Sequence, residues 1–168
     1  MIRVEVDSVR VSLMSQHRMV VLRETDGNRY LPIWIGPFEA DAITIELQGV
    51  PMARPLTHDL IKSILAELNA GVSRIVVSDL RDDTFYARIV LDVDGAQREV
   101  DSRPSDAIAL AVRTHAPLYV APHVMDEASI ISESDTEGEK LSKEEEENLS
   151  VFRDFLDGLD AEKPARGN

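Results

Sequence analysis

Apolar and polar residues alternate over the first part of the chain, and this pattern predicts extended strands. The alternation in residues 2–13 changes phase at Ser8, which indicates one strand interrupted by a β-bulge. Residues 18–24 and 29–35 alternate on either side of an Asp-Gly-Asn turn, which predicts a β-hairpin. Because proline cannot donate a backbone hydrogen bond, Pro32 places the second strand of this hairpin at a sheet edge.

Three later segments have the spacing and end signals of helices. Pro37 is suited to the first helical position, and the helix it begins is expected to end near Gly49. Thr57 is expected to cap a second helix, which carries a broad apolar stripe and ends near Gly71. A third helix over 107–115 is apolar nearly all round, so we expect it to be buried. Further strands are expected over residues 73–80, 84–93, 96–101 and 118–120, with one more helical turn from Pro122.

The order of these elements predicts the fold class. Three strands precede two helices, three more strands follow, and one helix and one short strand come last. Because hairpins dominate and the helices are segregated, we predict an α+β fold rather than alternating α/β. Its antiparallel or mixed sheets would carry three main helices, all within a single domain over residues 1–131.

The composition changes after residue 131. Residues 132–168 hold 12 acidic and 5 basic residues, a net charge of −7. We predict an acidic, disordered linker over 132–141, then an amphipathic helix and a loose C-terminus over 142–168. We expect this helix to dock reversibly by its apolar side, and an arginine-bearing groove to be one surface it could cover, which would make the tail autoinhibitory.

Charge and cysteine content narrow the function classes. The 168-residue chain has a net charge of −13, which argues against a basic protein that coats nucleic acid passively. It has no cysteine, so it lacks disulfides, thiolate metal sites and cysteine nucleophiles, which fits the reducing cytoplasm. The first residues do not form a signal peptide, and no run approaches the about 18 apolar residues that span a bilayer. We therefore expect no membrane partner.

Three segments resemble the bifunctional nuclease domain family. They are LPIWIG at 31–36, RPLTHDL at 54–60 and VDSRPSDAIALA at 100–111, in the order and at about the spacing of the family. The resemblance covers roughly residues 1–130. It implies a compact α+β domain that self-associates and hydrolyses both DNA and RNA, but it supplies no settled set of catalytic residues.

The third of these segments places two acids and an arginine at a strand-to-helix junction. Hydrolysis of a phosphodiester needs an activated water and compensation of the charge on phosphorus, which Mg²⁺ or Mn²⁺ held by carboxylates can supply. Asp101 and Asp106 are candidate catalytic and metal-binding acids, and Arg103 is a candidate phosphate ligand. The structural alternative is that Asp106 interacts with the helix dipole while Asp101 pairs with Arg103.

Two other helix starts carry candidate residues. His58 is a candidate base, Arg54 a phosphate contact, and Asp59 and Glu39 are possible metal ligands. The structural alternative is that His58 and Asp59 are ordinary first-turn residues and that Glu39 belongs to a solvated or subunit-facing helix. We expect at least a dimer, with strand 32–35 and the helix after it carrying surplus apolar surface.

Two functions of different classes follow. The first is a nuclease acting on DNA and RNA, with metal assistance. The second is a non-catalytic module that regulates by binding a nucleotide or a protein in the same groove of arginines and acids.

Overall fold

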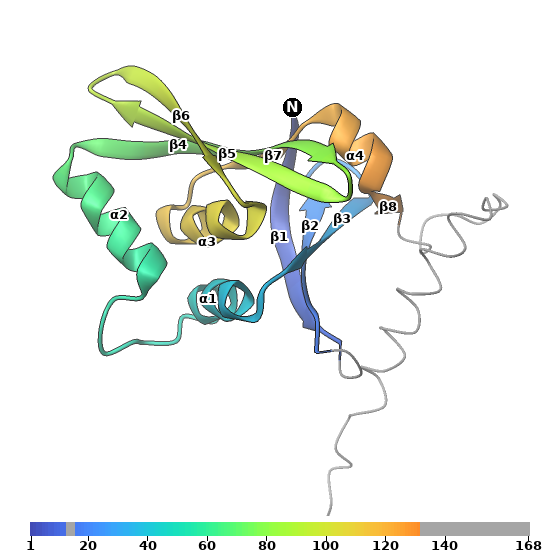
Figure 1. Ribbon diagram of the computed structural model, residues 1–168, viewed down its shortest axis with the longest axis horizontal. Coiled ribbons are helices and arrows are strands. Elements are labelled where there is room, and N and C mark those ends of the chain that lie inside the picture. The colour runs from blue at the N-terminus through green and yellow to red at the C-terminus, as the bar shows by residue number, and fades with distance from the viewer. Residues whose placement is uncertain (13–15, 132–168) are drawn as a thin grey trace, which may run out of the picture.

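The computed structural model describes residues 1–12 and 16–131, which form an eight-stranded mixed sheet and four helices (Figure 1). The α+β prediction is therefore confirmed. The predictions for 132–168 lie outside the described residues. The strands are β1 (Ile2–Val11), β2 (Arg18–Glu24), β3 (Arg29–Ile35), β4 (Ala70–Arg81), β5 (Thr84–Val93), β6 (Ala96–Ser102), β7 (Leu118–Val120) and β8 (Ile130–Ile131). The helices are α1 (Pro37–Leu47), α2 (Thr57–Glu67), α3 (Pro104–Thr114) and α4 (Pro122–Ala128).

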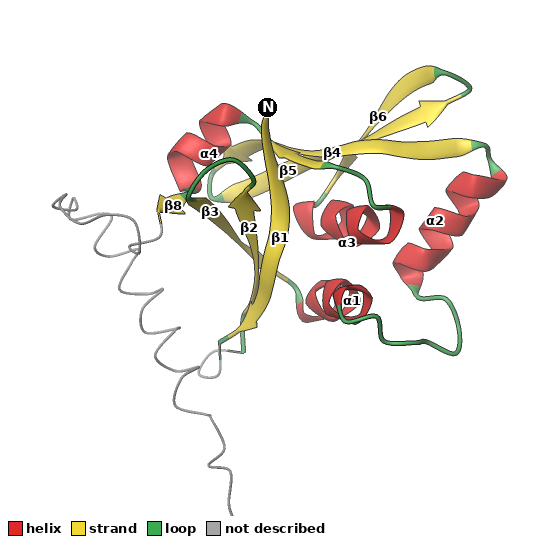
Figure 2. Cartoon of the chain, turned by 180° about the vertical axis from the view of Figure 1, so that it is seen from behind, coloured by secondary structure: helices red, strands yellow, loops and turns green. Residues whose placement is uncertain are grey.

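The sheet has the strand order β6-β5-β4-β7-β1-β2-β3-β8, so the first strand of the chain lies inside it. Figure 2 shows β1 crossing the middle of the molecule between the two halves of the sheet. Every neighbouring pair is antiparallel except β4 and β7, which run parallel. Short β7 joins the β4–β6 meander to the β1–β3 meander, so the two hairpin units share one core.

The expected bulge and hairpin are both present. The register of β1 against β2 shifts between Val6 and Ser8, where the alternation of the sequence changes phase. Strands β2 and β3 pair directly around their turn. Strand β8 pairs only with Arg29 and Tyr30, so within the described residues no strand pairs with the outer side of Pro32, as its missing donor requires.

The three larger helices lie on one side of the β4–β6 meander, with α3 next to the strands and α1 and α2 beyond it (Figure 1). Because α3 lies between strands and helices, it is buried along almost its whole length, as its apolar sequence predicts. The core joins residues of both meanders to α3 and α4: among others Val20, Leu22, Leu31, Ile75, Val77, Ala107, Ile108, Val124 and Met125.

Three details differ from the sequence predictions. Helix α2 ends at Glu67, and Gly71, near which we expected it to end, lies in β4. Thr57 is the first helical residue of α2 rather than its N-cap; the cap position is Leu56, whose N–H donates to the carboxylate of Asp59 at 2.8 Å. Strand β8 was not predicted, because a strand of two residues is too short to show alternation.

Candidate functional site

Arg103 lies at the N-terminus of α3 and binds carboxylates from two helices. Its Nε and one terminal nitrogen donate to the two oxygens of Asp106, one turn further along α3, at 2.7 and 3.1 Å. The same terminal nitrogen donates to Oε1 of Glu39, in the first turn of α1, at 2.7 Å. One guanidinium therefore connects the starts of α1 and α3, although 64 residues separate the two side chains in sequence.

His58 extends this group to a third helix. From the first turn of α2, its Nε2 lies 3.3 Å from Oδ1 of Asp106. The residue is only 7% exposed, and its Nδ1 is buried with no hydrogen-bond partner among the described residues. We call Glu39, His58, Arg103 and Asp106 the Arg103 cluster. It forms because the N-termini of α1, α2 and α3 point to one place.

The cluster combines an exposed cation with shielded acids. Hydrogen bonds from Arg103 to Asp106, and then to Glu39, raise the pKa of Arg103 above its ordinary value, so the guanidinium is charged throughout the physiological range. Its side chain is 65% exposed, whereas that of Asp106 is 31% exposed. The positive helix ends add to the field of Arg103. The guanidinium is thus the most exposed charged group of the cluster, and the two acids hold it in place.

Asp59 belongs to a different interaction. Its carboxylate accepts hydrogen bonds from the N–H of Leu56 and from Nε of Arg113, the latter at 2.7 Å. Burial opposes ionisation of Asp59, but the hydrogen bonds from Leu56 and Arg113 outweigh it and lower its pKa. Arg113 also donates to the carbonyl oxygens of Ala109 and Ala42. Asp59, which we predicted as a metal ligand, therefore helps to tie α2 to α3 and, through Arg113, to α1.

Arg113 is the residue of this region that sequence analysis missed. It is 2% exposed and is among the largest fully buried side chains of the described residues. The sequence does contain one indication, because Arg113 lies within an otherwise apolar helix. A charged side chain that is buried there needs hydrogen-bond and ionic partners.

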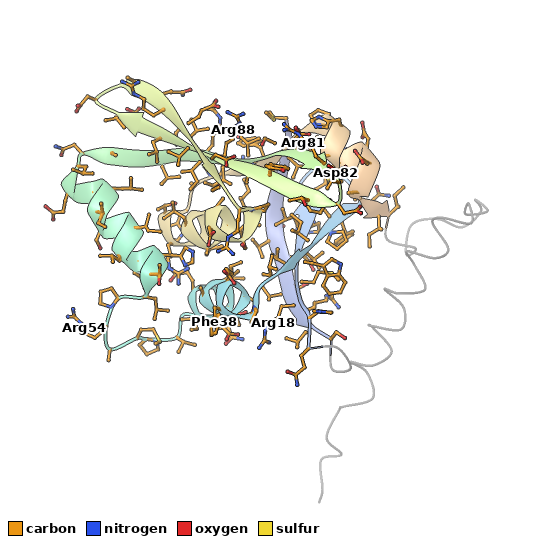
Figure 3. The ribbon with its side chains drawn as sticks, in the orientation of Figure 1. Arg18, Phe38, Arg54, Arg81, Asp82 and Arg88 are labelled. Atoms are coloured by element: carbon orange, nitrogen blue, oxygen red, sulfur yellow. The ribbon has the colours of Figure 1, made fainter. Side chains whose placement is uncertain are left out.

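Asp101 is not part of the Arg103 cluster, which corrects the expectation that Asp101 and Asp106 line one surface. In the sheet register Asp101 pairs with Arg88, and Ser102 pairs with Ala87. Ala87 is buried against the α3 side of the sheet, so Arg88 and Asp101 point to the other side. Figure 3 shows Arg88 on the side of the sheet away from α1.

On that outer side Asp101 lines an open cavity of about 360 Å³. The guanidinium of Arg81 lies 5.1 Å from the ring centroid of Tyr86 and binds Asp79. Its hydrogen bond and a second one from His123 lower the pKa of Asp79. This cavity holds both signs of charge, and each of its arginines already has an acidic partner.

Arg54 lies in the loop between α1 and α2, at the far end of the molecule from the β8 edge (Figure 3). It lines a cavity of about 320 Å³ together with Met52, Asp59 and Arg113. The structure therefore places Arg54 beside the interaction between α2 and α3. Within the described residues, no hydrogen bond or ion pair joins Arg54 to the Arg103 cluster.

The carboxylates of the cluster do not fit a metal ion as they are arranged. Both oxygens of Asp106 accept hydrogen bonds from Arg103, and Glu39 accepts one as well. Across residues 1–12 and 16–131, no three His, Asp or Glu side chains form a group that could hold a metal. Within the same residues, no helix has the length and apolar character to cross a membrane.

Fold and site together define a class: an α+β domain in which an arginine joins acids and a histidine at the N-termini of three helices. The family described as Bifunctional nuclease domain matches residues 20–133, and the chain belongs to this family. An uncharacterized protein of Mycobacterium tuberculosis is 38% identical over 156 residues, which cover 93% of each chain.

The plant relatives are similar over a smaller share of the chain. Bifunctional nuclease 1 of Arabidopsis thaliana is 29% identical over 108 residues, 62% of this chain and 33% of the plant protein. Bifunctional nuclease 1 of Oryza sativa subsp. japonica is 26% identical over 116 residues, 67% of this chain and 35% of its own length. Membership of the family, and with it the resemblance found in the sequence, is thus confirmed.

Proposed function

We propose that this protein is a nuclease that hydrolyses phosphodiester bonds of DNA and RNA. The observation that carries the proposal is the Arg103 cluster, which lies within the region that matches the family and offers an exposed guanidinium beside a carboxylate. The names of the plant relatives support the same reaction. The absence of cysteine agrees with a reducing, cytoplasmic setting.

Arg103 is the phosphate ligand in this proposal. A planar guanidinium matches two phosphate oxygens and stabilises the additional negative charge of the transition state. In the free protein Asp106 and Glu39 hold two of its nitrogens, so a phosphate must compete with them for the guanidinium. Release of Asp106 from Arg103 would free its oxygens beside the bound phosphate at the moment when a base is needed.

Asp106 is the catalytic base, and His58 is a positioning residue. The carboxylate of Asp106 is partly exposed, whereas His58 is buried and contacts it through Nε2. Asp106 takes a proton from a water whose oxygen attacks phosphorus; the bond to the leaving sugar oxygen breaks, and that oxygen takes a proton from solvent. Glu39 holds the other side of Arg103 and so also acts on position.

The paired state of Arg103 also favours a second candidate. A guanidinium that is already bound by two acids binds a ligand weakly unless the ligand displaces them. A nucleotide or acidic protein segment that displaces both acids would shift the positions of α1 and α3. The chain would then be a regulatory binding module, which uses the same cluster without chemistry.

The test is cleavage of end-labelled single-stranded DNA and RNA by the purified full chain, with Mg²⁺, Mn²⁺ or a chelator in separate arms. We expect Asp106→Asn to lower kcat by about 10²-fold or more, since general base catalysis contributes about 10²–10⁴. Arg103→Lys keeps the charge but loses the planar fork, so it should raise KM as well. His58→Gln should lower kcat less than Asp106→Asn does.

Asp101→Asn is the matched control, because it removes the same charge five residues away on the other side of the sheet. It should cleave like the wild type. Cleavage lost in Asp101→Asn and kept in Asp106→Asn would contradict the assignment. If no metal arm shows cleavage but a labelled nucleotide binds and Arg103→Ala abolishes that binding, the regulatory module is the better description.

A further inference from the structure

The cavity beside Arg54 has no part in the cleavage reaction proposed above. It lies where the loop 48–56 meets the end of α1 and one side of α2, and its volume is about 320 Å³. Pockets that hold small organic molecules usually measure about 300–1,000 Å³. The segment RPLTHDL, which resembles the family, supplies Arg54, Pro55 and Asp59 to the lining. We call this the Arg54 cavity, and its size suits one small organic molecule.

Hydrogen bonds at both ends of the loop shape the Arg54 cavity. Gly49 has a φ of 62°, in the left-handed region that favours glycine, and it turns the chain at the end of α1. The N–H of Val50 then donates to the carbonyl oxygen of Ile45 at 3.0 Å. At the other end, the N–H of Leu56 donates to the carboxylate of Asp59 at 2.8 Å. Both ends of the loop are therefore fixed without a ligand, which lowers the entropy cost of binding one.

Part of the lining is apolar and open to a ligand. Ile45, Val50 and Met52 line the cavity, and the exposed fractions of Val50 and Met52 are 44% and 48%. A methionine side chain adapts its shape to a neighbour, and its sulfur makes favourable contacts with aromatic rings. A flat, largely apolar ring system is therefore the kind of group that fits here.

Four charged residues also line the cavity, and two of them neutralise each other. Nε of Arg113 donates to Oδ1 of Asp59 at 2.7 Å. Arg54 is exposed, and within the part of the chain that the structure describes neither Arg54 nor Glu46 has an ion pair. The charges left for a ligand are thus one guanidinium and one carboxylate. They suit a ligand that carries an anionic group and, apart from it, hydroxyl donors.

We propose that the Arg54 cavity binds a ribonucleoside monophosphate. Arg54 lies at the outer rim of the loop, where its guanidinium binds the phosphate at the mouth of the cavity (Figure 3). The base packs against the apolar part of the lining. The ribose hydroxyls donate to the carboxylate of Glu46, which is how acids recognise ribose in dinucleotide-binding folds. Inorganic phosphate lacks the apolar contact and a deoxyribonucleotide lacks one hydroxyl, so both should bind more weakly.

Helix α2 connects the Arg54 cavity to the Arg103 cluster. Asp59 lines the cavity, and Nε2 of its neighbour His58 lies 3.3 Å from Asp106 of the cluster. A ligand that joins the loop 48–56 to α2 therefore also fixes the turn that carries His58. This consequence, unlike the binding itself, rests on the proposed function. Hydrolysis of RNA releases ribonucleotides, and the cavity would let such a product act on the site that forms it.

Titration calorimetry on the full chain, with adenosine monophosphate as the probe, tests the site. We expect saturable binding to the wild type and a dissociation constant about 10–100-fold higher for Arg54→Gln, which loses charge-assisted hydrogen bonds. Arg3→Gln is the matched control, because Arg3 is an exposed arginine on β1, and it should bind like the wild type.

Three results of this titration would overturn the proposal. They are no saturable binding to the wild type, unchanged affinity in Arg54→Gln, and affinity that is lost in Arg103→Ala but kept in Arg54→Gln. In the last case the nucleotide would lie in the Arg103 cluster. The probe contains no phosphodiester bond that joins two nucleotides, so a failure of the proposed nuclease function leaves the expected binding unchanged.

Methionine-methyl NMR tests the position of the ligand, because Met52 lines the cavity. Met52→Leu identifies the signal. The methyl resonance of Met52 should shift as adenosine monophosphate is added, through the ring current of the base, and inorganic phosphate should shift it less. Saturable binding that leaves this resonance unchanged would place the nucleotide elsewhere and overturn the proposal.

Deoxyadenosine monophosphate tests the contact with ribose. The wild type should bind the ribonucleotide more tightly than the deoxyribonucleotide, and this preference should disappear in Glu46→Ala. Glu46→Gln keeps an acceptor oxygen, so it should keep part of the preference. Equal affinity of the wild type for the two nucleotides would overturn the assignment of a ribonucleoside.

Discussion

Helices α2 and α3 each contain eleven residues and each carry an apolar stripe, yet they pack in opposite ways. Helix α3 buries its apolar residues between the sheet and the other helices. Of the residues of α2 itself, only His58 is buried, and its leucines and isoleucines other than the partly buried Leu65 are exposed. An amphipathic pattern therefore predicts that a helix has an apolar surface to cover, but it does not specify which partner covers it.

The difference has a physical cause in Arg113. This arginine lies near the end of α3, is buried, and needs acceptors on every side. Asp59 and two backbone carbonyls supply them, so the polar side of α2 must face α3. Polar contacts set the orientation of α2, and most of its apolar side chains are left exposed.

The largest effect is expected from a core deletion in α3. Ile108 is completely buried, so Ile108→Ala removes apolar contacts and leaves a cavity, and it should lower the free energy of unfolding by about 3–4 kcal/mol. Urea denaturation, monitored by the fluorescence of Trp34, measures this change in the free energy of unfolding. A loss below 1 kcal/mol would mean that α3 is not the core helix described here.

The second effect concerns the ion pair that orients α2. Arg113→Met keeps most of the side-chain volume but leaves Asp59 without its cation. We expect the free energy of unfolding to fall by about 2–3 kcal/mol. The loss is smaller than for a fully buried pair because Asp59 is partly exposed. Arg54→Met is the control, because this arginine is exposed in the loop before α2. Equal losses in the two variants would show that Arg113 does not hold α2.

A smaller effect is expected from Asp59→Asn, and it depends on pH. The folded pKa of Asp59 lies below its ordinary value of 3.8, so the unfolded chain binds that proton more readily. The stabilisation from Asp59 is complete above pH 3.8 and is lost as the pH falls through the folded pKa. The variant should be less stable at pH 7 by about 1 kcal/mol, and the difference should narrow in acid. A difference that grows as the pH falls would contradict this sign.

The smallest effect is expected from Ile64→Ala, the same type of deletion on the exposed helix face. Ile64 is about half exposed, so the free energy of unfolding should change by no more than about 0.5 kcal/mol, as measured by urea denaturation. A loss as large as that of Ile108→Ala would place Ile64 in the core.

Most strands and helices followed directly from the sequence. The phase change at Ser8, the turn before Arg29 and the prolines that begin α1, α3 and α4 are local signals, so they could be recognised without knowledge of the tertiary structure. The order of strands could not be predicted. Strand β7 has three residues and yet joins both meanders, and nothing in its composition indicates that role.

The candidate site divides in the same way. Glu39, His58, Arg103 and Asp106 could each be singled out because each lies in or next to the first turn of a helix. Their meeting depends on how three helices converge, which no spacing along the chain reveals.

Asp101 and Arg113 show two further limits. Proximity in sequence suggested that Asp101 joins Asp106, whereas the alternation of β6 turns it to the other side of the sheet. Arg113 was missed because charged residues near helix ends are usually solvated.

The position of β1 has a consequence for the way the chain folds. Strand β1 is an interior strand whose two neighbours, β2 and β7, are separated by almost a hundred residues of chain. One edge of β1 can pair early with β2. The other edge can pair with β7 only after residue 120 has been synthesised. Pairings of such long range slow folding, and an unpaired strand edge promotes aggregation meanwhile. A nascent chain whose synthesis stalls before β7 should therefore be prone to aggregation and depend on chaperones.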